Sequence, residues 1–202
     1  MGVQLLSVSY KTTPIEIRSL FAFNEEQQEM ILDGLCGQEH IEEAVVLSTC
    51  NRMEVYCYSD DQADASKIFE QMLFIVSGTA GADHVENLRD YILLYQGQKA
   101  MHHLFRVAAG LDSMVIGEDQ ILGQVKHAHE FSHSRNRCST YLNTLFRYAV
   151  TCSKKIKTDT VLSKTSVSTA TLAVKAAEHE LGSLQDKKMM IIGASGKIGG
   201  IV

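Results

Sequence analysis

Cys50 and Arg52 are the residues of this 202-residue chain whose types and spacing most directly suggest covalent chemistry. They lie between two apolar runs, residues 44–47 and 55–58, which are typical of buried strands, so residues 48–53 are expected to form an exposed connection. In an extended backbone, positions i and i+2 point to the same side, and a guanidinium near the thiol would favour the nucleophilic thiolate. The alternative is that Cys50 fills the end of a strand, since free cysteine is among the most buried residue types.

Two further stretches carry residues that can take part in binding or proton transfer. His102 and His103 lie in an apolar helical pattern, so either is a buried structural histidine or a general acid near the thiol. Residues 110–124 are small, polar and punctuated by glycine, and loops of this kind often carry binding groups. The alternative is a loop that connects two helices and ends in an Asp or Glu cap.

The segment His129–Glu130–Phe131–Ser132–His133 fits the zinc-hydrolase pattern H-E-x-x-H. On a helix this spacing places two imidazoles one turn apart, with a glutamate as general base. No third ligand or extended signature follows it, and a chain with eight histidines produces the pattern by chance in on the order of 2% of cases. We therefore expect no metal site.

Charge and glycine patterns mark two possible sites for phosphate groups. Residues 126–164 include eight basic residues and two acidic ones. This excess of positive charge suits either contact with a phosphate backbone or a solvated helix face. Residues 193–200 follow an apolar stretch at 187–192 and read Gly-Ala-Ser-Gly-Lys-Ile-Gly-Gly, which is typical of a phosphate-binding turn between a strand and a helix.

Composition limits the class of protein. The net charge of −5 argues against a general nucleic-acid coat protein, and a single proline favours long helices. Five cysteines at irregular spacing predict neither a disulfide framework nor a cysteine-rich zinc site. The first residues lack a signal-peptide pattern and no apolar run is long enough for a membrane span, so we expect a cytoplasmic protein.

Apolar periodicity predicts an α+β fold. The first 96 residues are expected to form a ferredoxin-like βαββαβ antiparallel sheet domain, with Asn24 as the N-cap of its first helix. Residues 97–160 are expected to form a helical subdomain that completes the domain. Residues 161–202 are expected to form a connecting helix and the first strand of a truncated Rossmann-type domain. Strands are predicted at 3–9, 44–47, 55–58, 90–95 and 187–192, and helices at 24–36, 63–76, 98–109, 119–134, 139–157 and 166–181.

Three separated motifs occur together in this chain. They are Lys-Thr-x-Pro at 11–14, Ser-Thr-Cys-Asn-Arg-x-Glu-x-Tyr at 48–56, and a long block from His103 to Lys126 that includes Gly-Leu-Asp-Ser at 110–113. In this order they closely resemble the glutamyl-tRNA reductase family, which opens the five-carbon route to tetrapyrroles, haem among them. The resemblance covers essentially the whole chain.

The resemblance implies a cysteine mechanism. Cys50 would attack the ester of glutamyl-tRNA to give a thioester, and hydride from NADPH would reduce that thioester to glutamate-1-semialdehyde. His103 matches the family's histidine needed for activity, and Arg52 suits the substrate's side-chain carboxylate. The substrate-binding residues would be Thr49, Asn51, Arg52, Ser113, Glu118, Asp119, Gln120 and Gln124, and the NADP phosphate loop would be Gly193, Ala194, Ser195, Gly196, Lys197 and Ile198.

The chain departs from the family pattern in two places. Asp119 replaces a usual proline, and the glycine loop differs from the usual Gly-Ala-Gly-x-Met-Gly. The resemblance further implies that this chain is a fragment without most of the reductase domain. The full-length parent would be a homodimer that hands its product to an aminomutase, with no membrane partner. The competing hypothesis is a non-enzymatic module that binds tRNA or a partner, with Cys50 structural or redox-sensing.

Overall fold

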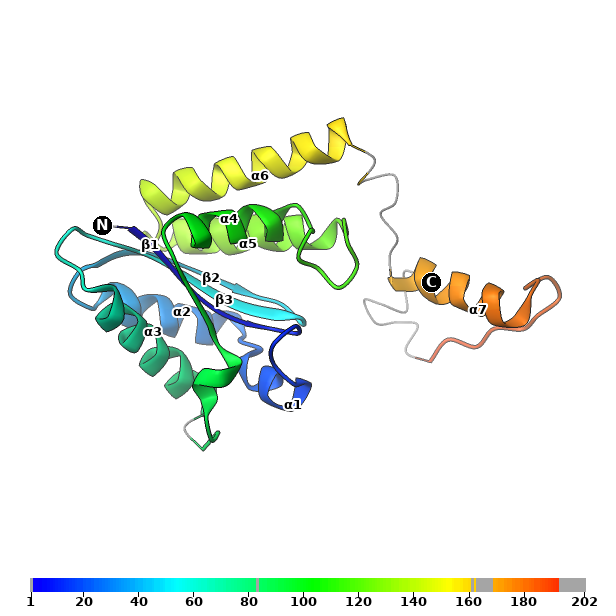
Figure 1. The fold of residues 1–202 in the computed structure, drawn as a ribbon, viewed down its shortest axis with the longest axis horizontal. Coiled ribbons are helices and arrows are strands. Elements are labelled where there is room, and N and C mark those ends of the chain that lie inside the picture. Colours follow the sequence, from blue (N-terminus) through cyan, green and yellow to red (C-terminus); the bar gives the residue numbers. More distant parts are fainter. Residues whose placement is uncertain (1, 83, 161, 163–168, 193–202) are drawn as a thin grey trace.

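A four-stranded antiparallel sheet forms the centre of the molecule (Figure 1). The computed structural model describes residues 2–82, 84–160, 162 and 169–192. The strand order is β2-β3-β1-β4, and each neighbouring pair is antiparallel. The strands are β1 (Gly2–Ser9), β2 (Ile41–Ser48), β3 (Arg52–Ser59) and β4 (Leu93–Gln96).

The helices alternate with the strands in the first half of the chain and follow one another in the second half. The α-helices are α1 (Ile15–Arg18), α2 (Glu25–Cys36), α3 (Ala65–Ala80), α4 (Gln98–Ala108), α5 (Gln120–Ser134), α6 (Tyr141–Asp159) and α7 (Thr169–Leu181). Two short 3-10 helices, η1 (Ser19–Phe21) and η2 (Leu88–Tyr91), complete the described elements. The sequence did not predict α1, η1 or η2, because one turn of helix is too short to show a period.

Both faces of the sheet are covered, which makes three layers (Figure 1). Helices α2 and α3 lie on one face, where Leu6, Val46 and Val55 form one apolar core with them. Helices α4, α5 and α6 lie on the other face, where Leu5 and Tyr56 belong to a second core. Because successive strand residues point to opposite faces, strands buried on both sides read as continuous apolar runs.

The predicted start of the first long helix is confirmed. Asn24 Oδ1 accepts a hydrogen bond from Gln27 N at 2.9 Å, and Gln27 Oε1 accepts one from Asn24 N at 3.1 Å. This reciprocal pair is a capping box, and Glu25 and Glu26 add negative charge in the first turn.

Other boundaries differ from the prediction. The two strands around Cys50 extend further than predicted and leave only residues 49–51 as their connection. Polar residues at the strand ends still take part in strand pairing, and Ser48 pairs with Met53. Helix α3 continues to Ala80, and the fourth strand begins three residues late because η2 occupies the preceding residues. Tertiary packing decides such boundaries, and propensity alone does not.

Helix α7 lies apart from the three layers (Figure 1). The predicted strand at 187–192 is not formed in the described chain, where Met189, Met190 and Ile192 are mostly exposed. A strand is stabilised by hydrogen bonds to a neighbouring strand, and none of the described strands pairs with these residues. Among the described residues, no helix has the length and apolar character needed to cross a membrane.

Candidate functional site

Cys50 lies at the tip of the hairpin between β2 and β3. The side chain of Thr49 stabilises this tip, since its Oγ1 accepts hydrogen bonds from Asn51 N at 3.2 Å and Arg52 N at 3.1 Å. Tyr10 N donates to Asn51 O at 2.9 Å and ties the tip to the end of β1. Cys50 itself is exposed, so its thiol is accessible to a substrate.

Alternation along β3 places Arg52, Glu54 and Tyr56 on the sheet face that α4, α5 and α6 cover. Arg52 is only 2% exposed, and its Nη1 donates to Glu54 Oε1 at 2.8 Å. Its Nη2 donates to Asp112 O at 2.6 Å and to Asp112 Oδ2 at 3.1 Å. The guanidinium therefore connects the sheet to the loop between α4 and α5.

This arrangement changes the expected role of Arg52. We expected its guanidinium to stand beside the thiol of Cys50 and to be available to a substrate carboxylate. The structure instead directs its terminal nitrogens to two buried carboxylates, because a buried cation must be paired to offset its desolvation. Arg52 still lines the pocket at Cys50, as described below.

His103 joins the same network through Glu54. His103 Nε2 lies 2.7 Å from Glu54 Oε1, and Tyr56 Oη donates to Glu54 Oε2 at 2.7 Å. Burial alone would raise the pKa of the Glu54 carboxyl, but His103, Arg52 and Tyr56 lower it from its ordinary 4.5 to about 2. Glu54 is therefore a buried anion that fixes the positions of His103 and Arg52.

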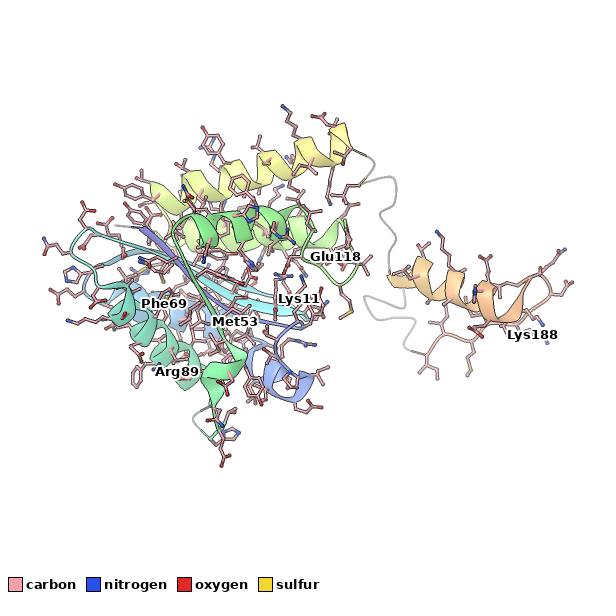
Figure 2. The ribbon with its side chains drawn as sticks, viewed as in Figure 1. Lys11, Met53, Phe69, Arg89, Glu118 and Lys188 are labelled. Atoms are coloured by element: carbon pink, nitrogen blue, oxygen red, sulfur yellow. The ribbon has the colours of Figure 1, made fainter. Side chains whose placement is uncertain are left out.

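Asp112 links this network to the turn after β1. Lys11 Nζ donates to Asp112 Oδ1, and Tyr10 Oη donates to Asp112 O at 3.5 Å. Although burial opposes ionisation, Lys11 and Arg52 lower the pKa of Asp112. Figure 2 shows Lys11 at the same end of the sheet as Glu118. Glu118 and Asp112 both lie on the loop between α4 and α5.

Two glycines give this loop its shape. Gly110 and Gly117 have φ angles of +74° and +82°, in the left-handed region that favours glycine. Gly117 N donates to Gly110 O at 3.0 Å and closes the loop. A Cβ on Gly117 would lie 2.9 Å from Leu162 O, so a side chain there would force the backbone to move.

A pocket of about 30 Å³ forms where the hairpin tip meets this loop and the start of α5. Ser113 is 7% exposed, and its hydroxyl has no hydrogen-bond partner within the described structure. A buried polar atom without a protein partner is costly, so this hydroxyl is available to hydrogen-bond a polar group in the pocket. The lining residues are Thr49, Cys50, Asn51, Arg52, Ser113, Met114, Glu118, Gln120, Ile121 and Gln124.

Of the ten predicted site residues that the structure describes, eight line this pocket and two do not. His103 is bound to Glu54 and is not part of the lining. Asp119 lies at the start of α5 without a side-chain capping bond, and Lys157 Nζ donates to its Oδ1 at 2.6 Å. The exposed carboxylate of Asp119 forms an ion pair with this lysine and does not line the pocket.

The sequence did not assign roles to several residues that support the site. Met114 and Ile121 complete the lining, and Glu54, Asp112 and Lys11 position Arg52. All five belong to the three motifs or lie inside the long block, so the motifs marked the region without showing which side chains meet. The residues Gly193, Ala194, Ser195, Gly196, Lys197 and Ile198 lie outside the described residues.

The two histidines of the H-E-x-x-H segment have partners of another kind. His129 Nε2 lies 2.9 Å from Asn143 Oδ1, and His133 Nδ1 lies 2.7 Å from Cys138 O. Among the described residues, no group of three metal-ligating side chains is present. These histidines join α5 to the start of α6.

The basic residues between 126 and 164 fall into two groups. Lys157, Arg135 and Arg137 pair with Asp119, Glu29 and Asp33 respectively. Lys164 lies outside the described residues. The exposed remainder is Lys126, Arg147, Lys154 and Lys155.

Comparisons with known proteins agree on one family. The family model described as "Glutamyl-tRNAGlu reductase, N-terminal domain" matches residues 6–160. Glutamyl-tRNA reductase from Carboxydothermus hydrogenoformans is 40% identical over 194 residues, which cover 96% of this chain and 42% of that protein. The same enzyme from Thermosynechococcus vestitus is 36% identical over 202 residues, which cover all of this chain and 46% of that protein.

A solved structure gives the same result. Glutamyl-tRNA reductase from Methanopyrus kandleri superimposes with a TM-score of 0.66 at 30% identity, over 92% of this chain and 41% of that one. This chain thus spans less than half the length of the relatives it matches.

Proposed function

This chain belongs to the glutamyl-tRNA reductase family, and from that premise we propose that it carries the acylation step of glutamyl-tRNA reduction. The parent activity is the NADPH-dependent conversion of glutamyl-tRNA to glutamate-1-semialdehyde, the first step of five-carbon tetrapyrrole synthesis. The observation that supports this proposal best is the pocket that combines the exposed Cys50 thiol with the buried, unpartnered hydroxyl of Ser113.

In the proposed step, Cys50 Sγ attacks the carbonyl carbon of the glutamyl ester. A C–S bond forms, the C–O bond to the terminal ribose breaks, and the ribose hydroxyl leaves with the thiol proton. Ser113 supplies a hydroxyl toward the reacting group, while Thr49 and Asn51 shape the hairpin tip. Bound NADPH would supply the hydride that reduces the thioester, and its proposed loop, from Gly193 to Ile198, rests on the family resemblance alone.

His103 acts through its neighbours in this proposal. It holds Glu54, which with Asp112 holds Arg52 at the edge of the pocket, so loss of the imidazole would remove one of the groups that position Glu54. Glu118, Gln120 and Gln124 face the pocket and serve as polar contacts for the glutamyl group. Asp119 holds the end of the loop against α6 through its hydrogen bond with Lys157.

We assign a ferredoxin-like catalytic subdomain to residues 1–96 and a helical subdomain to residues 97–160. Residues 161–202 begin the nucleotide-binding part in this scheme. The strand order and the alternation of strands with helices support the first assignment. Dimerisation of the parent and transfer of its product to an aminomutase follow from the family and complete the proposal.

Labelled glutamyl-tRNA tests the acylation step. The wild-type chain and a Cys152→Ser variant should form a labelled thioester or release free glutamate by its hydrolysis, whereas Cys50→Ser should do neither. Cys152 is a suitable control because it lies on α6 and lines no part of the pocket. If the wild type gives neither adduct nor free glutamate, the competing hypothesis of a non-catalytic tRNA- or partner-binding module gains support.

A further inference from the structure

Charge is distributed unevenly between the two helical layers, although the whole chain carries a net charge of −5. Helices α2 and α3, on one face of the sheet, contain five acidic residues and one basic residue. Helices α4 and α6, on the other face, contain one acidic residue and six basic residues. The six are Lys99, Arg106, Arg147, Lys154, Lys155 and Lys157. Positive charge is therefore gathered on one side of the molecule.

Helix α6 lies on the outside of the molecule and turns a polar face to solvent (Figure 1). Its apolar side, with Leu142, Phe146 and Ala149, is buried in the second core. The exposed residues on the opposite side form what we call the α6 strip, which consists of Thr144, Arg147, Tyr148, Thr151, Lys154, Lys155 and Thr158. The first four of them line a hollow of about 380 Å³.

The charges of the α6 strip are available to a partner. Arg147, Lys154 and Lys155 form no ion pair with another residue of the described chain, in contrast to Lys157, which pairs with Asp119. The other members of the strip are three threonines and a tyrosine, so each of them carries a hydroxyl group. Proteins contact the phosphates and sugars of nucleic acids with these same groups, namely Arg, Lys, Ser, Thr and Tyr side chains.

A lipid surface fits this strip less well than a nucleic acid. A helix that binds a membrane surface buries an apolar face among the lipids. The apolar face of α6 is already occupied by the second core, and the strip itself contains no aliphatic side chain. Its chemistry therefore favours a phosphate backbone in water.

The C-terminal end of the α6 strip lies beside the Cys50 pocket. Lys157 Nζ donates to Glu118 O at 3.1 Å, and Glu118 lines that pocket. Arg147 lies ten residues before Lys157, about 15 Å along the helix axis. Phosphates follow one another every few ångströms along a nucleic-acid strand, so the strip is long enough to contact several of them.

From these observations we propose that the α6 strip binds the phosphate backbone of the helical body of the tRNA substrate, while the aminoacylated end enters the Cys50 pocket. This inference rests on the proposed function, which makes a tRNA the substrate, and adds a contact surface away from the reacting ester. Proteins recognise double-stranded RNA mainly by its shape and its phosphates, so this contact depends little on base sequence. It raises the affinity and orients the RNA without taking part in glutamyl transfer.

A labelled RNA duplex that lacks a single-stranded 3′ end tests the strip without any chemistry at Cys50. Fluorescence anisotropy should show equal binding by the wild-type chain and Cys50→Ser. The triple variant Arg147→Gln, Lys154→Gln, Lys155→Gln should bind on the order of 30-fold more weakly at about 0.1 M salt. The slope of log affinity against log salt should fall by about 3, one for each lost phosphate contact.

The matched control is the triple variant Lys67→Gln, Lys187→Gln, Lys188→Gln. It makes the same change in net charge at three exposed lysines away from α6, so the affinity should change by no more than about 2-fold. Circular dichroism checks that both triple variants keep the fold, which exposed substitutions should not alter. Tyr148→Phe keeps the charge and the ring, and the loss of its hydroxyl should weaken binding about 3-fold.

Three results would overturn the proposal. They are no duplex binding by the wild type, equal losses of affinity in the two triple variants, and strip-dependent binding of phosphatidylserine vesicles in preference to the duplex. The last result would assign the strip to a membrane surface. Failure of labelled glutamyl-tRNA to acylate Cys50, with strip-dependent duplex binding intact, would instead contradict the proposed function and leave the RNA-binding surface standing.

Discussion

The five cysteines of the chain lie in different environments, and the hairpin tip gives Cys50 the most accessible one. Cys50 is exposed, whereas Cys57 and Cys138 are buried. Burial raises the pKa of Cys36 to about 11 and that of Cys138 to about 12, so both remain neutral thiols at neutral pH. Accessibility thus distinguishes Cys50 from the other four thiols.

Removal of the buried hydroxyl of Ser113 should affect the rate of acylation but not the stability of the fold. Ser113→Ala should leave the free energy of unfolding unchanged or slightly raised, because the lost hydroxyl has no partner in the folded chain. It should lower the rate of Cys50 acylation about 10-fold, the cost of one hydrogen bond to substrate. Urea unfolding and labelled-substrate kinetics on the same preparation measure the two effects. A drop in stability with unchanged acylation would show that the hydroxyl is structural.

Glu54 offers a test of the buried charge network. Glu54→Gln should destabilise the fold by roughly 3–5 kcal/mol, because it leaves Arg52 without one of its buried partners. The matched control is Glu70→Gln on α3, which removes an exposed ion pair with Arg89 and should cost at most about 1 kcal/mol. Equal losses in the two variants would contradict the importance of the network.

The same network predicts how stability depends on pH. The pKa of Glu54 is lower in the folded chain than its ordinary 4.5, at about 2. The folded state therefore binds fewer protons, and the stabilisation is fully present above pH 4.5 and is lost as the pH falls toward 2. Unfolding measured across this range should show a steeper acid loss for the wild type than for Glu54→Gln.

At the scale of elements, Glu43 joins β2 to α6. Its Oε1 accepts hydrogen bonds from Ser139 Oγ at 2.9 Å and from Thr140 N and Tyr141 N at 2.8 Å, and its Oε2 accepts one from Leu142 N at 2.8 Å. These are donors that a helix start leaves unsatisfied, so a strand residue acts as the cap of a distant helix. Burial alone would raise the pKa of Glu43, but these hydrogen bonds lower it below its ordinary value.

Glu43→Gln should cost about 2–3 kcal/mol, because one oxygen acceptor becomes an NH₂ group that faces backbone donors. Glu42→Gln is its control: Glu42 is the preceding residue of the same strand and is exposed. That variant should stay within about 0.5 kcal/mol of the wild type. Thermal unfolding of both variants measures the difference, and similar melting temperatures would argue against the cap.

At the scale of the whole molecule, the two apolar cores share one sheet. Within the described part of the chain, the buried residues of both cores lie between Val3 and Ala149, so these cores include α6 and contain no residue of α7. Helix α6 alone contributes Leu142, Phe146 and Ala149, each fully buried. The sheet and its two helical layers should therefore unfold as one cooperative unit.

Deletion experiments check this inference. Removal of residues 169–202 should change the free energy of unfolding of the sheet and its helices by no more than about 0.5 kcal/mol. Removal of residues 141–202 should abolish cooperative unfolding, since it exposes the face of the sheet under α6. Circular dichroism with urea titration measures both, and loss of the transition in the shorter deletion would show that α7 supports the core.

The sequence by itself determined the four strands of the sheet, the long helices and the segments that meet at the candidate site. Apolar periodicity predicted the four strands of the sheet and the long helices, because burial on one or both faces repeats along the chain. The Asn24 cap could also be predicted, since its partners lie within one helical turn. The motifs around Cys50 and residues 110–124 marked the segments that line the pocket.

Only the tertiary structure decided which side chains meet. Arg52 and Asp112 are 60 residues apart, and Glu43 and Leu142 are 99 apart, so no local pattern reveals these contacts. The pairing of the Arg52 guanidinium with Glu54 and Asp112, for example, follows from its burial in the packed fold. Local periodicity fixes which face a residue occupies, whereas the partner across that face depends on how distant elements pack.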